Sequence, residues 1–123
     1  MDEIVKRDWG YWDVLQEYDG TCKVKELVVN PGCQLSWQKH EHRSEHWFCS
    51  RGLATVYYSA DNHGKEVFKT YITQFKTFDI AQGKWHQLAN ESETPVHIIE
   101  IQFGSDCRES DIIRSERPPL NYQ

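Results

Sequence analysis

The chain has 123 residues and a net charge of −5, from 19 acidic and 14 basic residues. Its 38% hydrophobic and 27% charged residues are typical of one soluble globular domain and exclude a disordered chain. The sequence has neither the basic stripe of a nucleic-acid-binding protein nor an apolar run near the ~20 residues of a membrane span. The first residues lack a secretion signal, so we expect a cytoplasmic protein with four reduced cysteines.

Short β-rich runs separated by turn signals dominate the chain, about 8–12 residues apart. Asp19-Gly20 is a hairpin signal between the first two runs, and Asn30-Pro31-Gly32 precedes the third. The predicted strands are 12–18, 21–29, 33–40, 46–50, 53–59, 65–73, 77–80, 85–90 and 96–103. Only 106–114 resembles a short helix. Many short strands with almost no helix indicate an all-β sandwich or small barrel.

The densest chemistry lies in the run 35–47. Side chains alternate along a strand, so Gln38 and His40 point the same way, with His42 as a further candidate. Glu45 opens the next strand. A later stretch contains His86, which can face the first cluster across the interior of a barrel.

A glutamine, two histidines and a carboxylate that converge would suit one divalent first-row metal ion: Zn, Mn, Fe, Co or Ni. Four protein ligands leave coordination positions for water or substrate, as catalytic sites need. The predicted ligands are Gln38, His40, Glu45 and His86. The alternative is a chance cluster of surface histidines.

The two stretches resemble the two motifs of the cupin superfamily. The first motif, G-x5-H-x-H-x3,4-E-x6-G, is matched at Gly32, Gln38, His40, Glu45 and Gly52, with Gln38 in place of the first histidine. The second, G-x5-P-x-G-x2-H-x3-N, is matched at Gly83, His86 and Asn90. The resemblance implies a cupin barrel, also called a double-stranded β-helix or jelly roll. It would form a single domain over 1–123, with a core at about 9–104 and a C-terminal extension, helix or tail, at 105–123.

Within the cupins, the chain is most similar to the type II phosphomannose isomerase (mannose-6-phosphate isomerase) domain. The stretch from Gln38 to Trp47 follows that domain's string Q-x-H-x-H-R-x-E-H-W. The segments Arg7–Tyr11, Ile98–Gly104 and Glu109–Arg114 also match it, so the likeness covers roughly 7–114. The family also implies a homodimer.

This resemblance implies a metal-dependent aldose–ketose isomerase acting on a hexose phosphate such as mannose 6-phosphate. Arg43, in the bend between His40 and Glu45, is then expected to lean over the pocket mouth and bind the phosphate. His42 and Glu100 are the acid–base candidates, and the face that carries Glu100 either lines a polar pocket or faces water. Two alternatives stay open: a cupin that binds a sugar or other small polar ligand without turnover, and, more weakly, a metal-dependent dioxygenase.

Overall fold

The computed structural model describes residues 4–120, which form eleven strands in two antiparallel sheets. The larger sheet has the order β1-β2-β3-β10-β5-β8, and the smaller has the order β11-β4-β9-β6-β7. The strands are β1 (Ile4–Arg7), β2 (Gly10–Tyr18), β3 (Cys22–Val29), β4 (Trp37–Lys39), β5 (Arg43–Arg51), β6 (Ala54–Ser59), β7 (Val67–Ile72), β8 (Thr77–Ile80), β9 (His86–Ala89), β10 (Val96–Gly104) and β11 (Ile113–Ser115). This confirms the all-β prediction.

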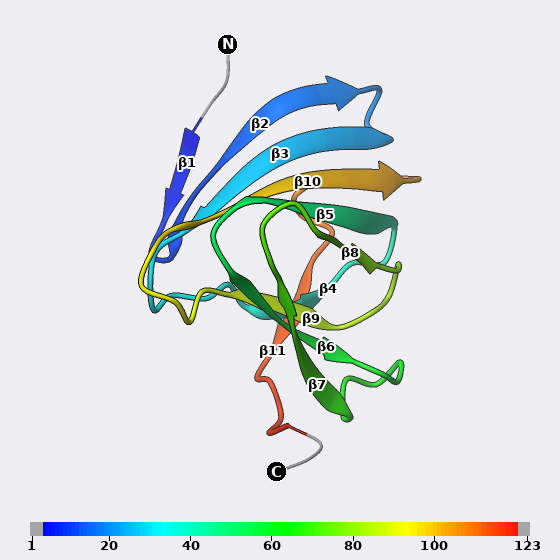
Figure 1. Cartoon of the computed structure of the whole chain (residues 1–123). Coiled ribbons are helices and arrows are strands. Elements are labelled where there is room, and N and C mark those ends of the chain that lie inside the picture. The colour runs from blue at the N-terminus through cyan, green and yellow to red at the C-terminus, as the bar shows by residue number, and fades with distance from the viewer. Residues whose placement is uncertain (1–3, 121–123) are drawn as a thin grey trace.

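The two sheets face each other, with the larger sheet in the upper part of Figure 1 and the smaller sheet below it. An apolar core lies in part of the space between them, where each sheet turns alternate hydrophobic side chains inward. Trp47 and Ile98 contribute from the larger sheet, and Val56 and Leu88 from the smaller one. The result is the barrel that the resemblance implies.

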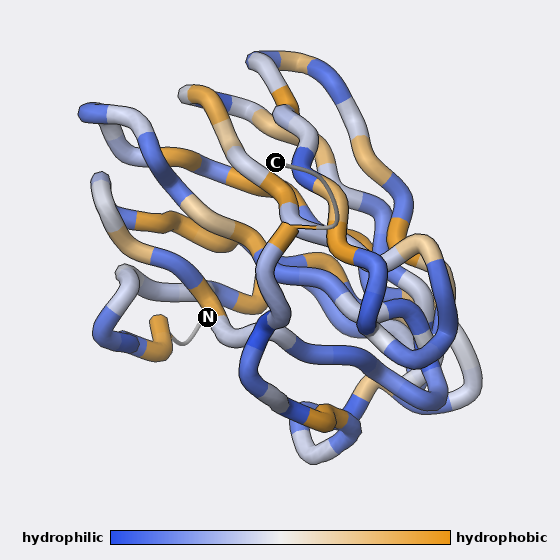
Figure 2. Tube along the Cα trace, turned by 90° about the horizontal axis from the view of Figure 1, so that it is seen from below, coloured by the Kyte–Doolittle hydropathy of each residue, from blue (hydrophilic) through white to orange (hydrophobic). Residues whose placement is uncertain are grey.

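The inner face of the larger sheet changes chemistry along its strands. Three successive inward rows, each with one residue from β3, β10 and β5, are Leu27, Ile98 and Cys49; then Lys25, Glu100 and Trp47; then Lys23, Gln102 and Glu45. All nine side chains are buried. Figure 2 shows that short hydrophobic and hydrophilic segments alternate along the whole trace. One half of the barrel interior is therefore apolar and the other half is polar and ionisable.

The predicted hairpin at Asp19-Gly20 joins β2 to β3. Asp19 and Gly20 have φ values of 52° and 74°, and the amide of Thr21 donates to the carbonyl of Tyr18 at 3.0 Å. Positive φ at both central residues is the type I′ geometry that matches the twist of paired strands. Tyr18 then pairs with Cys22, which sets the register at this end of the β2–β3 pair.

The outer face of the smaller sheet is covered by residues that follow β11. Trp37 and Trp85 stack there with their ring centroids 5.9 Å apart, and Leu120 packs against this cluster. The guanidinium of Arg117 lies 3.9 Å from the ring centroid of Tyr57. Part of the outer face of the smaller sheet is therefore buried as well.

The helix expected within 106–114 is wrong: this segment forms turns and then β11. Two of its acidic side chains bind partners far away in the sequence instead of supporting a helix. The carboxylate of Glu109 pairs with the amines of Lys23 and Lys25, and that of Asp111 accepts from the backbone amides of residues 41 and 42. β1 also lies outside the predicted strands, because four residues are too few to show a period.

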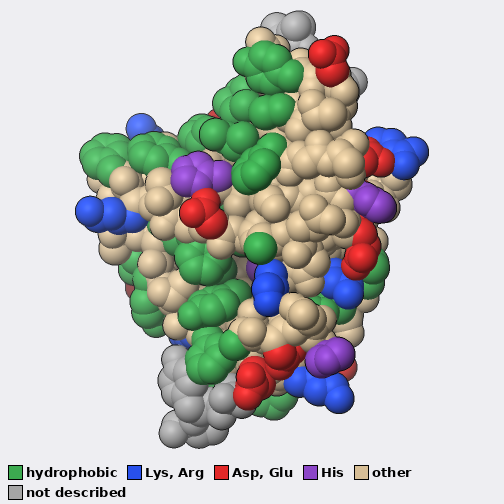
Figure 3. Space-filling view, turned by 90° about the vertical axis from the view of Figure 1, so that its right-hand side faces the viewer, with side chains coloured by type: hydrophobic (Ala, Val, Ile, Leu, Met, Phe, Trp, Pro, Cys, Tyr) green, Lys and Arg blue, Asp and Glu red, His purple; other side chains and the backbone are tan. Residues whose placement is uncertain are grey.

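Several large hydrophobic side chains reach the surface, and Figure 3 shows hydrophobic groups spread over one side of the molecule between charged ones. Scattered exposure of this kind is normal for folded proteins. Within the part of the chain that the structure describes, no helix is long and apolar enough to cross a membrane.

Candidate metal centre

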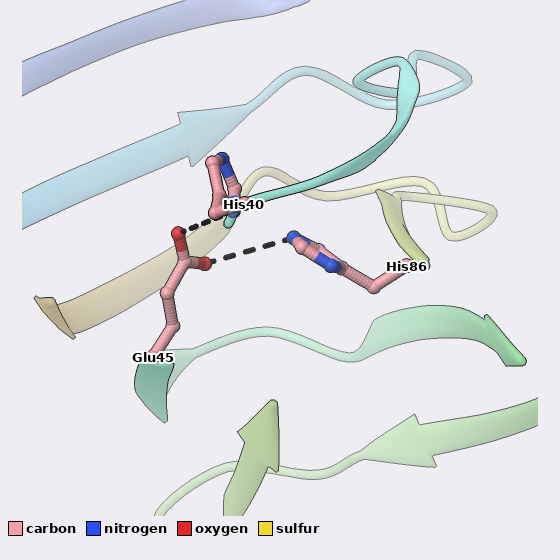
Figure 4. A group of neighbouring side chains, drawn as sticks. All are labelled: His40, Glu45 and His86. Atoms are coloured by element: carbon pink, nitrogen blue, oxygen red, sulfur yellow. Dashed lines mark ion pairs between the residues drawn. The ribbon is translucent and has the colours of Figure 1, made fainter. Parts of the chain in front are cut away.

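Three predicted ligands meet inside the barrel, although they come from three separate parts of the chain. His40 follows β4, Glu45 lies in β5 and His86 begins β9. One ligand atom from each residue lies within 4.8 Å of the other two, and all three side chains are buried. Figure 4 shows the Glu45 carboxylate between the two imidazoles, with Oε2 at 3.3 Å from Nδ1 of His40 and Oε1 at 3.7 Å from Nε2 of His86.

His86 has the protonation pattern of a metal ligand. Its Nδ1 lies 2.9 Å from the carbonyl oxygen of Lys84, which can only accept, so Nδ1 carries the hydrogen. Its Nε2 is then a lone-pair donor, and it is buried without a hydrogen-bond partner among the described residues. A backbone carbonyl that orients one ring nitrogen while the other is left to bind is typical of metal-ligating histidines.

Both imidazoles are held neutral, as metal binding requires. Burial, followed by the charges of Arg43 and His86, lowers the pKa of His40 to about 2. Burial lowers the pKa of His86 to about 4. Nε2 of His40 accepts from the Arg43 guanidinium at 2.9 Å, so an ion bound at this nitrogen would replace that hydrogen bond. The three residues therefore fit a divalent ion in charge, protonation and burial.

Gln38, the fourth predicted ligand, lies beside this group. It pairs with His86 across β4 and β9 and lines the same cavity as His40 and Glu45. Its Oε1 accepts from the hydroxyl of Ser36 at 2.9 Å, which orients the amide. Its role as a ligand stays a prediction.

Arg43 lines the same cavity, but it is buried and does not lean over the pocket mouth as expected from a bend residue. It is the first residue of β5 and is 5% exposed. Its Nε donates to Glu45 at 3.1 Å, its NH2 group to His40, and its NH1 group to the carbonyl of Arg108 at 3.1 Å. The expected placement is wrong because this buried guanidinium is held by three hydrogen bonds to its surroundings.

The two acid–base candidates lie in different places. His42 is exposed and is absent from the cavity wall, so the structure does not bring it to the ligands. Glu100 is buried in that wall, so the face that carries it lines a polar pocket. Nε1 of Trp47 donates to both Glu45 and Glu100 at 3.0 Å, and Gln102 donates to Glu100 at 2.7 Å. Burial and the charge of Glu45 raise the pKa of Glu100 to about 8.

A cavity of about 480 Å³ between the two sheets is lined by Gln38, His40, Arg43, Glu45 and Glu100, whereas His86 lies outside its wall. Sequence reasoning missed several residues of its wall: Arg7, Lys25, Glu109 and Arg114. Inward alternation along β3 could have found Lys25. The other three lie on β1, in the turns before β11, and on β11, where no periodic signal exists.

Comparison with known proteins identifies relatives of this chain. The family described as "Mannose-6-phosphate isomerase C-terminal" matches residues 1–117. Xanthan biosynthesis protein XanB of Xanthomonas campestris pv. campestris is 38% identical over 112 residues, which are 91% of this chain and 22% of XanB. The chain thus spans about a fifth of the length of the curated relatives it matches.

Solved structures with the same fold are more distant in sequence. Capsular polysaccharide assembling protein CapF from Staphylococcus aureus has a TM-score of 0.81 at 18% identity, over 94% of this chain and 34% of CapF. A double-stranded β-helix protein from Klebsiella pneumoniae has a TM-score of 0.69 at 16% identity, over 94% of this chain and 86% of that chain. These similarities establish the double-stranded β-helix fold.

Proposed function

Because this chain belongs to the mannose-6-phosphate isomerase C-terminal family of cupins, we propose that it is a metal-dependent isomerase of a hexose phosphate. The observation that supports this most is one cavity whose wall contains His40, Glu45 and a separate buried carboxyl, Glu100, with His86 next to His40 and Glu45 behind that wall. A binding module needs no such second acid. An aldose–ketose isomerase does need one, because it must move a proton between two adjacent carbons.

The roles follow from this arrangement. A divalent ion bound by His40, Glu45 and His86 would polarise the sugar carbonyl and stabilise the developing negative charge on its oxygen. In its ionised form, which the charge of a bound ion would favour, Glu100 takes the proton from C2 of the aldose and returns it to C1. The C2 hydroxyl proton passes to the former carbonyl oxygen. The product is the ketose, with no net change in atoms. Trp47 and Gln102 hold the Glu100 carboxyl in place through their N–H groups.

The experiment is an isomerisation assay with mannose 6-phosphate and other hexose phosphates, in the presence of added Mn, Co or Zn. Glu100→Gln should lower kcat by about 100-fold or more while metal content stays unchanged. Glu26→Gln is the matched control, since Glu26 lies on the outer face of the same sheet and pairs with His97. An unchanged rate in Glu100→Gln would contradict the proposed proton transfer.

Thermal melting in the presence of the same sugars tests the alternative, a cupin that binds without turnover. A hexose phosphate that raises Tm with no isomerisation under any metal would establish a binding protein.

We also propose a homodimer, which the family resemblance implies. Exposed hydrophobic side chains on the N-terminal hairpin, Ile4 and Leu15, support it. Light scattering at micromolar concentration should give twice the 14.6 kDa chain mass. A monomer would contradict this proposal.

A further inference from the structure

We propose that Arg7 and Arg114 form an anion-binding site that holds the phosphate of the substrate, and that Arg43 does not bind it. This two-arginine site rests on the proposed function, because it assigns the part of the same cavity that recognises a phosphorylated sugar. It would discriminate a sugar phosphate from the neutral sugar.

The two arginines reach the cavity from the edge strands of opposite sheets. β1 is the edge of the larger sheet, and its alternate residues Val5 and Arg7 line the cavity. β11 is the edge of the smaller sheet, and Ile112 and Arg114 line the same cavity. The two cations therefore belong to one cavity wall, although 107 positions separate them in the chain.

Arg114 is also placed in relation to the metal centre. It pairs directly with Gln38 in the register of β11 and β4, and Gln38 pairs in turn with His86. Directly opposed residues of an antiparallel pair lie on the same face of the sheet. Gln38 on β4 therefore lies between Arg114 on β11 and His86 on β9.

The charges of these two arginines are not neutralised. Within residues 4–120, neither Arg7 nor Arg114 has an acidic group within ion-pair distance, and Arg7 donates only to the neighbouring carbonyl of Lys6 at 3.2 Å. Both side chains are exposed, so an anion can reach them. By contrast, Lys25 in the same wall already pairs with Glu109 at 2.7 Å.

Arg43 is buried and already engaged with the metal-ligand group, whereas Arg7 and Arg114 are exposed. Its three guanidinium nitrogens already donate to Glu45, to His40 and to the carbonyl of Arg108. A phosphate bound there would break contacts that orient two metal ligands. Arg43 is thus a positioning residue for Glu45 and His40.

The ligand chemistry follows from the cations. A phosphate monoester is close to a dianion at neutral pH, and a guanidinium can bind two of its oxygens at once. Two unpaired guanidinium groups beside a polar cavity suit such a dianion better than a neutral hydroxyl. The site would therefore hold the phosphate while the carbonyl end of the sugar lies toward His40 and Glu45.

The test compares Arg7→Gln, Arg114→Gln and the double variant with Arg51→Gln, an exposed arginine of β5 outside the cavity wall. Calorimetry measures Kd for mannose 6-phosphate, mannose and inorganic phosphate, and elemental analysis measures metal content. We expect each single variant to weaken both phosphate-containing ligands about 10-fold, and the double variant about 100-fold. Mannose affinity and metal content should stay unchanged, as should all values for Arg51→Gln.

Arg43→Gln distinguishes phosphate binding by Arg7 and Arg114 from phosphate binding by Arg43. It should lower metal content and weaken mannose and mannose 6-phosphate alike. If it selectively weakens phosphate-containing ligands while the double variant does not, the two-arginine site is wrong, whereas the isomerase proposal stands. If the double variant loses phosphate binding but wild-type protein isomerises no sugar, the site stands and the proposed function fails.

Discussion

Strands β3, β5 and β10 present apolar side chains to one half of the barrel interior and ionisable side chains to the other. Leu27, Ile98 and Cys49 fill one inward row, whereas Lys23, Gln102 and Glu45 lie side by side two rows away. The backbone is continuous and antiparallel through both halves, so the backbone pairing itself is the same. The difference shows that one sheet can supply stability at one end and chemistry at the other through side-chain choice alone.

Trp47 lies at the border between the halves. Its ring packs in the apolar core, and its N–H reaches the carboxyls of Glu45 and Glu100. The apolar half thereby fixes the position of groups in the polar half. If the two halves have these different roles, substitutions in the polar half should lower metal binding, and substitutions in the apolar half should lower the free energy of unfolding.

The largest effect is expected from removing two ligands in the polar half. In the double variant His40→Ala, His86→Ala, bound metal should fall from about one ion per chain to almost none, because one carboxylate alone binds a divalent ion weakly. Elemental analysis of protein purified without chelator measures this. His46→Ala, His97→Ala is the control, since both of these histidines pair with carboxylates on the outer face. Equal metal content in the two double variants would contradict the site.

The next effect concerns stability in the apolar half. Ile98→Ala should lower the free energy of unfolding by about 2–5 kcal/mol, because it leaves a cavity in a fully buried row. Lys23→Met should cost less than about 1.5 kcal/mol, since it replaces a buried ionic contact by an apolar side chain of similar size. Urea unfolding measures both. A loss in Lys23→Met as large as that in Ile98→Ala would mean that both halves stabilise the fold equally.

Trp47→Phe tests the connection between the halves. The substitution keeps an aromatic ring in the core but removes the N–H shared by Glu45 and Glu100. We expect metal affinity to fall about 10- to 100-fold, as is usual when a residue that orients a ligand is lost. Competition with a chelator measures the Kd. Trp85→Phe, on the outer face of the smaller sheet, should leave the Kd unchanged.

The smallest expected effect is a pH dependence of the free energy of unfolding that comes from Glu109 in the cavity wall. Burial alone would raise the pKa of Glu109, but the charges and hydrogen bonds of Lys25 and Lys23 lower it below the ordinary 4.5. A depressed pKa stabilises the fold above the unfolded value, and this contribution is lost as pH falls from about 4.5 through the lower folded value. Because the Glu109 side chain is 46% exposed, we expect less than about 1 kcal/mol.

Urea unfolding of wild type and Glu109→Gln at about pH 6 and about pH 3 measures this contribution. The stability gap between the two proteins should shrink at the lower pH. Glu116→Gln serves as the control, because Glu116 is exposed and forms no ion pair with any other described residue. A gap that is the same at both pH values would show that Glu109 does not titrate differently on folding.

Alternation and motif spacing predicted the parts of the site that lie on regular strands. They indicated that His40, Glu45 and His86 come together, and that Glu100 shares a face with Ile98. The position of Arg43 could not be predicted in this way, because it depends on a carbonyl 65 residues away. Arg7 and Arg114 were missed for another reason: three- and four-residue edge strands contain too little sequence to reveal a period.

The border between the apolar and polar rows also bears on how the chain finds its strand pairing. Alternation alone excludes a slip of one residue, because that would turn every inward side chain outward. A slip of two residues preserves alternation and is not excluded by it. In β10, however, such a slip would place Glu100 opposite Leu27 or Ile98 opposite Lys25. Unpaired burial of that kind is costly, so the residues that build the site also make the native pairing of the larger sheet unique during folding.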